Sequence, residues 1–455
     1  MASTTETNEY VKLKLLVNEE SNKVVFAEAG KEFVDILCSF LTMPLGTVAR
    51  LMQKDSSMGP VSVGCLNSLY QTVKDLNKEC LWKDSDKEML LQPKNSSEDY
   101  CSTLKFNIDD SQPTKYFIRC LNSYCDYSST LYLSTSMDDE RCKCRSAKRS
   151  VVLKHFHEGF VNSDASFVIT DDLKIMPNTM VYTSFSLLKN SGIVTSSTKE
   201  MTVIVTKEKV LDLLKCALVS KSPLTDMFLG NKPSIERSSF FSCEVENDLN
   251  ADIQITVELV IRKSDGKILF AHGEQDFTDL LLSFLTFPLG GVVCKLGGCS
   301  SIGSIDGLYK SIVELDENQC LKSKEAKNRL VDPHLAKEYI SSKQILPINQ
   351  SRVNYYCYYQ GQDSKQSIVD CKFFITNEYR RDEGKYVEMH LVKDNENTRN
   401  EGYLKGPRTY LATDDLVIGP SSPISCLGIL KAALTSTSAL TNGLSHLLTE
   451  DMEEN

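Results

Sequence analysis

The octapeptide SFLTMPLG at residues 39–46 returns almost unchanged as SFLTFPLG at residues 283–290. Longer stretches around both copies also match, in the same order: residues 11–51 with 257–296, 64–76 with 302–315, 170–173 with 413–416, and 210–229 with 426–444. Chance resemblance does not preserve the order of several separate matches, whereas duplication of a domain does. The sequence therefore predicts two tandem related domains.

Each copy begins with a predicted β-hairpin followed by a predicted helix. Two strand-like runs, residues 12–17 and 23–27, are joined by a polar turn, and the second copy carries an Asp-Gly turn signal at residues 264–266. Apolar residues then recur at helical spacing in both copies: Phe33, Ile36, Leu37, Phe40 and Leu41, and Phe277, Leu280, Leu281, Phe284 and Leu285. This spacing gives each helix one wide apolar face that must be buried.

The PLG sequence that closes each octapeptide predicts a corner between two helices. Pro44 and Pro288 end the first helix, because proline has no amide hydrogen and disfavours helical backbone in the residue before it. Proline is well tolerated as the first residue of the helix that follows. Gly46 and Gly290 would let the corner pack closely. An anion site at the start of the second helix is an alternative, but no Gly-Lys-Ser/Thr sequence accompanies it.

The remaining elements favour the α+β class. The sequences FVITDDL and TYLATDDL read as a strand running into a turn, in which aspartate and threonine act as turn and cap residues. We therefore expect each domain to hold an antiparallel sheet with helices on one side, the two domains being related by a pseudo-twofold axis. The offset between copies falls from 243 residues at TDDL to 216 at Leu214 and Leu430, so the second copy is 27 residues shorter there.

These matches predict the domain boundaries. The expected order is a flexible N-terminus at 1–10, a first repeat domain at 11–235 with an extra segment near 174–200, a linker at 236–251, a shorter second domain at 252–449, and an acidic tail at 450–455. The linker assignment follows from its polar composition, rich in serine, asparagine and acidic residues.

Composition narrows the cellular setting. Lys and Arg total 51 against 61 Asp and Glu, and the net charge of -10 weighs against a nucleic-acid or anionic-lipid partner. The polar start lacks the apolar core of a secretory signal, and the longest apolar run, residues 280–293, is too short to span a membrane. We therefore expect an intracellular protein, cytoplasmic or nuclear, whose 16 cysteines are mostly reduced thiols.

One group of cysteines is a candidate metal site. Cys120, Cys125, Cys142 and Cys144 form two close pairs, and four thiolates suit a tetrahedral structural zinc. The spacings are C-x4-C and C-x-C, so free cysteines in a hairpin remain an alternative. The second copy keeps only Cys357 and Cys371 in the matching region, so any such site belongs to the first copy alone.

Other reactive residues give no catalytic signature. His155 and His157 lie two apart without a counterpart in the second copy, which favours a half-exposed strand. The acid pairs 171–172 and 414–415 recur in both copies, but adjacent side chains on a strand point to opposite faces, which suits turn chemistry better than catalysis. The basic cluster at 141–149 and the tyrosines at 355–359 lie in different copies, so they make a weak single-strand nucleic-acid site.

The matched motifs resemble a known family. FAEAGKEFVDILCSFLTMPLGTVARL, GCLNSLYQTVKDL, the TDDL turn and LLKCALVSKSPLTDMFL are similar to those of a plant family that shares domain of unknown function 674. The resemblance covers both repeats and implies a plant protein, but no activity. Members of that family carry cysteine pairs resembling C-x2-C and C-P-x-C; the cysteines at 120, 125, 142 and 144 fall at matching places, with altered spacing and without the proline.

The sequence therefore predicts a non-catalytic interaction or scaffold protein with a protein partner, because what the copies share is almost wholly core-forming and turn-forming. A small-ligand-binding protein or enzyme with a site between the repeats is the alternative, since duplicated domains often form a cleft at their junction. A zinc-stabilised nucleic-acid binder is a weaker alternative. Neither the partner nor the oligomeric state follows from the sequence.

Overall fold

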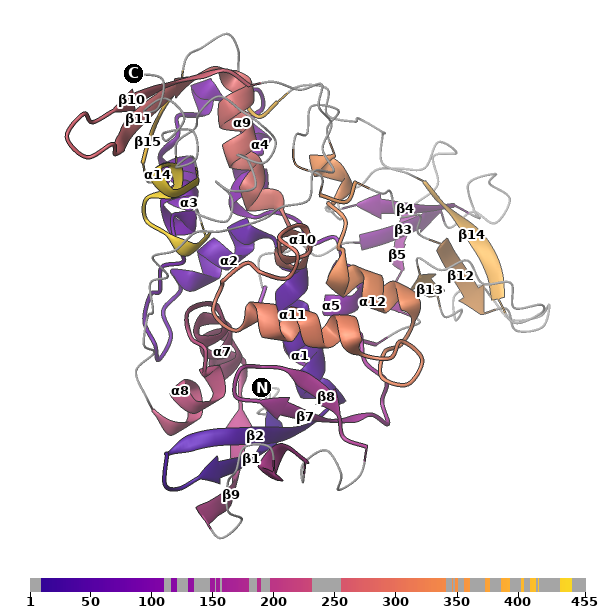
Figure 1. The fold of residues 1–455 in the computed structure, drawn as a ribbon. Helices are drawn as coiled ribbons and strands as arrows, with labels where there is room; N and C mark the ends of the chain where they lie inside the picture. The colour runs from indigo at the N-terminus through magenta and orange to yellow at the C-terminus, as the bar shows by residue number, and fades with distance from the viewer. Residues whose placement is uncertain are drawn as a thin grey trace, which may run out of the picture. The chain divides into compact units, whose positions relative to one another are not determined.

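The structure, a computed structural model, falls into two compact units (Figure 1). It describes residues 10–109, 158–179, 197–230 and 255–340, with shorter pieces at 116–120, 130–134, 148–151, 153–155, 186–189, 346, 348–350, 356–360, 373–376, 386–392, 402–404, 410–414, 416 and 434–443. The larger unit comprises Met1–Asp109, Phe160–Gln350 and Arg399–Asn455, and the smaller comprises Asp110–Gly159 and Ser351–Thr398. Each unit thus draws on both predicted repeat domains, whose boundaries stay a prediction.

The first sheet of the larger unit is antiparallel and has the strand order β8-β7-β2-β1-β9. Its strands are β1 (Val11–Asn18), β2 (Lys23–Gly30), β7 (Ser166–Thr170), β8 (Ile175–Pro177) and β9 (Thr198–Val205). Residues along β1 alternate between buried and more exposed, because successive side chains of a strand point to opposite faces. The predicted hairpin at the start of the first copy is confirmed.

Helices cover the buried face of this sheet. Helix α1 (Lys31–Thr42) contacts β1, β2 and β7, and α8 (Pro223–Leu229) contacts both β2 and α7 (Lys207–Val219). All five residues of the predicted apolar stripe in α1 are fully buried. Figure 1 shows these helices above the sheet. The prediction of an α+β fold with an antiparallel sheet is confirmed.

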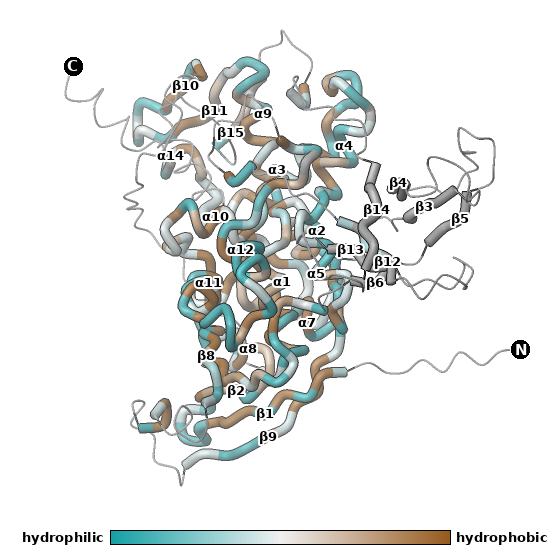
Figure 2. The backbone as a smooth tube through the Cα atoms, turned by 90° about the vertical axis from the view of Figure 1, so that its right-hand side faces the viewer, coloured by the Kyte–Doolittle hydropathy of each residue, from teal (hydrophilic) through white to brown (hydrophobic). Residues whose placement is uncertain are grey.

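The second sheet of the larger unit is shorter and antiparallel, with the order β10-β11-β15. It consists of β10 (Val257–Ile261), β11 (Ile268–Gly273) and β15 (Tyr410–Thr413). The matched helix follows β11 as α9 (Gln275–Ser283) and continues as a 3-10 turn, η3 (Phe284–Thr286). Its apolar stripe is buried as well. Figure 2 shows the hairpin of β10 and β11 as hydrophobic strand segments around a hydrophilic turn.

The two PLG corners pack against each other. The main chain at Pro44 and Pro288 forms an isolated antiparallel bridge. Two hydrogen bonds of 2.9 Å flank it, from Leu45 N to Phe287 O and from Leu289 N to Met43 O. The first amide of each following helix, α2 (Leu45–Met52) and α10 (Leu289–Lys295), is therefore committed to the opposite corner, which argues against the anion-site alternative.

The details of the corner agree with the glycine prediction and correct the proline prediction. A Cβ atom on Gly290 would lie 2.5 Å from Leu330 O and 2.9 Å from Leu41 O, so only glycine fits there. Gly46 is similarly enclosed. Pro44 is the N-cap of α2, one residue before the first helical position where we expected it, and its carbonyl accepts the amide of Val48 at 3.0 Å.

The helices that follow each corner cross to the other half. Helices α3 (Leu66–Asp75) and α4 (Asp84–Leu91) contact α9 and η3, while α11 (Ile305–Glu314) and α12 (Lys324–Val331) contact α1. Isolated bridges between Leu81 and Leu404 and between Val161 and Leu321 also join the two halves. Short elements complete this unit: η1 (Lys78–Cys80), α5 (Glu98–Cys101), η4 (Lys337–Tyr339) and α14 (Ala439–Gly443).

The smaller unit is a seven-stranded sheet with the order β5-β3-β4-β14-β12-β13-β6. Its strands are β3 (Tyr116–Cys120), β4 (Thr130–Ser134), β5 (Lys148–Val151), β6 (Leu153–His155), β12 (Tyr356–Gln360), β13 (Phe373–Thr376) and β14 (Tyr386–Val392). Strands from the same half pair antiparallel, and strands from different halves pair parallel, as β4 with β14 and β6 with β13. Among the described residues, no helix is both long and apolar enough to cross a membrane.

Candidate functional site at the edge of the second sheet

The predicted metal site lies outside what the structure describes. Cys120 ends β3, but its side chain and all of Cys125, Cys142 and Cys144 fall outside the described residues. Within the described ranges no cluster of three or more histidine, cysteine, aspartate or glutamate side chains could hold a metal ion. The zinc site therefore stays a prediction.

The histidine and tyrosine candidates belong to the sheet of the smaller unit. His155 ends β6 and pairs with Ile375 of β13, and His157 falls outside the described residues. Tyr358 of β12 is buried. The position of His155 agrees with the prediction that it lies on a strand.

Two matched aspartates hold the backbone of the fold. Asp35 in α1 accepts hydrogen bonds from the amides of Phe160 and Val161, at 2.7 and 3.0 Å. Asp279 in α9 likewise accepts hydrogen bonds from two consecutive amides, Tyr403 N at 2.8 Å and Leu404 N at 3.0 Å. Burial raises the pKa of Asp279 to about 6. Both carboxyl groups are structural.

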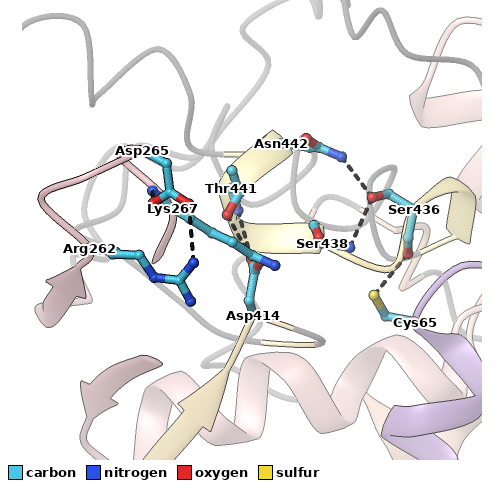
Figure 3. Close-up of polar contacts among 9 residues, drawn as sticks. All are labelled: Cys65, Arg262, Asp265, Lys267, Asp414, Ser436, Ser438, Thr441 and Asn442. Atoms are coloured by element: carbon cyan, nitrogen blue, oxygen red, sulfur yellow. Dashed lines mark hydrogen bonds and ion pairs between the residues drawn. The ribbon is translucent and has the colours of Figure 1, made fainter. Parts of the chain in front are cut away.

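The TDDL aspartates cap a helix instead of forming an acid pair. Asp171 accepts hydrogen bonds from the amide and the hydroxyl group of Thr225, at 2.8 and 2.6 Å, and so caps the first turn of α8. Asp414 accepts the same two bonds from Thr441 of α14, at 3.1 and 2.8 Å (Figure 3). The prediction that turn and cap chemistry explains this motif agrees with these contacts.

A buried polar cluster joins the halves beside α12. The fully buried guanidinium group of Arg329 donates to Glu325 Oε1 at 2.8 Å and to Ser96 O at 2.7 Å, and lies 2.9 Å from His334 Nε2. Burial and the charge of Arg329 lower the pKa of His334 to about 3, so this imidazole is neutral at physiological pH. A pKa this low makes the imidazole a weak proton acceptor and therefore a poor general base.

The strongest candidate for function is the β10–β11 hairpin, which has the same register as the β1–β2 hairpin. Leu15 pairs with Ala27 and Leu259 pairs with Ala271, and both ladders shift register directly after the next residue. This places Leu13, not Val11, at the position that matches Val257, a correction to the start of the sequence match. The two hairpins therefore match residue by residue, with a constant offset.

The neighbours of the two hairpins differ. Strand β1 pairs with β2 on one side and with β9 on the other, through all eight of its residues. Within the part of the chain that the structure describes, β10 pairs with β11 alone and forms the edge of its sheet. The extra segment predicted near residues 174–200 contains β8 and the first residues of β9.

Burial at the matched positions reflects this difference. Val17 at the end of β1 is 6% exposed, whereas Ile261 at the matched position of β10 is 38% exposed. Leu15 is 1% exposed, whereas Leu259 is only partly buried. Among the residues that the structure describes, strand β10 therefore presents unpaired backbone groups beside exposed apolar side chains, which together can accept another strand.

Several polar contacts lie around the turn of the hairpin. Lys267, directly before β11, has its Nζ atom 3.4 Å from Oδ2 of Asp414, the residue that caps α14 (Figure 3). Arg262 and Asp265 form an ion pair of 3.1 Å across the turn. On the other side of α14, Cys65 Sγ donates to Ser436 O at 2.8 Å. Of these contacts, the one between Lys267 and Asp414 joins the hairpin to the residue that caps α14.

The sequence alone did not identify this edge as a site. The one relevant sequence feature is the predicted shortening of the second copy by 27 residues. It indicates an open edge only in combination with the pairing of β9 with β1.

Comparison with known proteins gives one match. The family model described as "Protein of unknown function (DUF674)" matches residues 7–442. No curated protein matches this chain. No solved structure matches it either.

Proposed function

We propose that this chain, which belongs to the DUF674 family, is a non-catalytic scaffold protein built from a duplicated domain that binds a protein partner along strand β10. One observation carries the proposal: β10 matches β1 residue by residue but has no counterpart of β9 within the described residues, and its apolar side chains are exposed. Addition of a partner strand to an exposed sheet edge is a common mode of peptide recognition.

Reciprocal contacts support the duplication. Each of the matched aspartates, Asp35 and Asp279, accepts hydrogen bonds from two consecutive amides. Tyr70 and Tyr309 each donate a hydrogen bond of 3.1 Å to the carbonyl group of the residue that ends the next matched helix. Such paired contacts are what two copies of one ancestral domain would retain about a pseudo-twofold axis.

The roles of the shared polar residues support a non-catalytic function. The matched aspartates bind backbone amides or cap helices, and burial beside Arg329 lowers the pKa of His334 to about 3, which makes it a weak proton acceptor. Enzymes instead direct titratable side chains into a shared cleft, with pKa values matched to the reaction.

The setting that we propose is the cytoplasm or nucleus of a plant cell. The eight cysteines whose side chains the structure describes are free thiols, which is typical of a reducing compartment. The plant assignment rests on the resemblance of the sequence motifs.

A peptide-display selection tests the proposal. A library of random peptides about ten residues long would be selected on the full chain, and the binders retested on the variant Ile261→Lys, since a lysine on an edge strand opposes strand addition. The expected result is a set of peptides that bind the natural chain and lose affinity for I261K.

The control is Val313→Lys. Val313 lies on α11 and is 41% exposed, close to the 38% of Ile261, so both variants place a lysine at an equally exposed apolar position. Binders that lose affinity for I261K and keep it for V313K support the β10 edge. Binders that distinguish neither variant would show that β10 is not the docking site.

A further inference from the structure

We infer the chemistry of the segment that docks on β10, an inference that rests on the function proposed above. The partner is an extended strand that runs antiparallel to β10 and places apolar side chains opposite Val257, Leu259 and Ile261 and a lysine or arginine opposite Glu258. We infer the direction and register of the partner strand from the pairing of β9 with β1. We infer its charge from Glu258.

Direction and register come from β9. This strand runs antiparallel to β1, and its residues Val203, Met201 and Lys199 pair with Leu13, Leu15 and Val17. The matched positions on the other hairpin are Val257, Leu259 and Ile261. A strand that takes the place of β9 beside β10 therefore lies opposite these three residues in the same direction.

The apolar requirement comes from burial. Side chains of a strand alternate between faces, so residues of the partner opposite Val257, Leu259 and Ile261 share the face that points to the core. Val257 is buried, Leu259 is partly buried and Ile261 is exposed, so apolar cover is increasingly incomplete toward the hairpin turn. Apolar partner residues there remove exposed apolar surface from water, which favours binding.

The charge requirement comes from a difference between the hairpins. In β1 the exposed Lys14 lies opposite Thr202 of β9. The matched residue of β10 is Glu258, which pairs with His272 of β11 and is exposed. Opposite charges directly across a pair of strands attract, and like charges repel. The partner residue opposite Glu258 is therefore basic.

A designed peptide tests this chemistry. Its core, Val-Thr-Val-Lys-Val, places lysine opposite Glu258 when it binds antiparallel in the register of β9. Two control peptides accompany it: Val-Thr-Val-Glu-Val, which reverses the charge, and Val-Lys-Val-Thr-Val, which places lysine opposite Glu258 only if the strand binds parallel. Binding of each labelled peptide to the full chain would be followed by fluorescence anisotropy.

The decisive measurement is a charge exchange between peptide and protein. We expect the natural chain to bind the lysine peptide about twofold to fivefold more tightly than the glutamate peptide. Glu258→Lys should reverse that preference by a similar factor. Ile261→Lys should weaken binding of both peptides, and Val313→Lys should change neither. Glu258 and Ile261 are exposed, and circular dichroism of each variant would check its fold.

Three outcomes would overturn the inference. Tighter binding of Val-Lys-Val-Thr-Val would show that the strand runs parallel. Peptide affinities that do not respond to E258K would refute the charge pairing. Dimers of the natural chain that disappear in I261K, seen by sedimentation velocity, would show that a second copy occupies the edge.

The selection experiment separates this inference from the proposed function. Selected peptides that require Ile261 but lack the predicted pattern would refute the partner chemistry and leave β10 as the docking site. A selection that yields no I261K-sensitive peptides would refute both.

Discussion

Gln275 donates a hydrogen bond of 3.3 Å to Asp279, at the position where Lys31 forms an ion pair with Asp35 in the matched helix. The two aspartates make the same backbone contacts, so the difference between them is the missing cation. Burial raises the pKa of Asp279 to about 6, from an ordinary value of 3.8. A charged carboxylate is therefore less favourable in the folded chain than in the unfolded one.

This difference between Asp35 and Asp279 predicts that the free energy of unfolding depends on pH. Because the pKa of Asp279 is raised on folding, its contribution to stability is fully present below pH 3.8 and is lost as the pH rises through about 6. Gln275→Lys supplies the missing cation, and should raise the free energy of unfolding at pH 7.5 by about 1 kcal/mol, with a smaller gain at pH 4.5. Urea unfolding at both pH values measures the effect. An equal gain at the two pH values would contradict it.

The contact between the PLG corners predicts that Gly290 cannot carry a side chain. Gly290→Ala would press a Cβ atom against two backbone carbonyl groups, which cannot move as a flexible side chain can. We expect the free energy of unfolding to fall by about 2 to 4 kcal/mol. Gly30→Ala is the control, because no atom lies within 4 Å of the added Cβ and φ is -91°. A loss of similar size in both variants would refute the role of the corner.

Lys215 is a second position at which we expect a substitution to destabilise the fold. Its ammonium group is buried and donates hydrogen bonds to Lys54 O, Ser56 Oγ and Gly59 O, at 2.6 to 2.7 Å. Lys215→Met removes the donor of these three hydrogen bonds, and should lower the free energy of unfolding by about 3 kcal/mol. Lys221→Met, at an exposed lysine, should change it by less than about 1 kcal/mol. Equal melting temperatures for the two variants would contradict the prediction.

The sheet edge predicts an asymmetry in hydrogen exchange. Strand β1 is paired on both sides, so the amides of residues 13–17 should exchange slowly, whereas the matched amides of Val257–Ile261 should include fast-exchanging groups. Exchange followed by mass spectrometry compares the two strands within one sample. Binding of the lysine peptide should slow exchange in β10 and leave β1 unchanged. Equal protection of both strands in the free chain would argue against an open edge.

The cysteine pairs predict a bound metal. Purified protein should contain zinc, and replacing Cys120 and Cys144 with serine should remove it, because a tetrahedral structural site needs all four ligands. Cys299→Ser is the control, since Cys299 is an exposed free thiol. Elemental analysis measures the metal content. Unchanged zinc in the double variant would exclude these cysteines as ligands.

Local elements were predictable because their signals are local. The apolar stripe from Phe33 to Leu41 lies within a single helix, so its period alone identifies the buried face. Pro44 marks the end of that helix for a reason confined to its own backbone. The fold class follows from such elements.

Contacts between distant segments were not predictable. The hydrogen bond from Leu45 N to Phe287 O joins two backbone groups. Nearly every residue type carries these groups, so the sequence does not indicate the contact. The residue-by-residue match between the two hairpins follows from strand pairing, such as that of Leu15 with Ala27. A sequence alignment that places a gap near the turn matches different residues. The exposed edge at β10 required both the structure of the first half and the shortening of the second.

The contacts of α3 with α9, of α4 with η3, and of α11 and α12 with α1 have a consequence for the integrity of the molecule. Among the described residues, the apolar helices α1 and α9 of each half are covered in part by helices of the other half. A single cut of the chain between the halves should leave two fragments that stay associated, because each shields the apolar helices of the other. Either fragment made alone should aggregate, or take up a second copy of itself in place of the missing half.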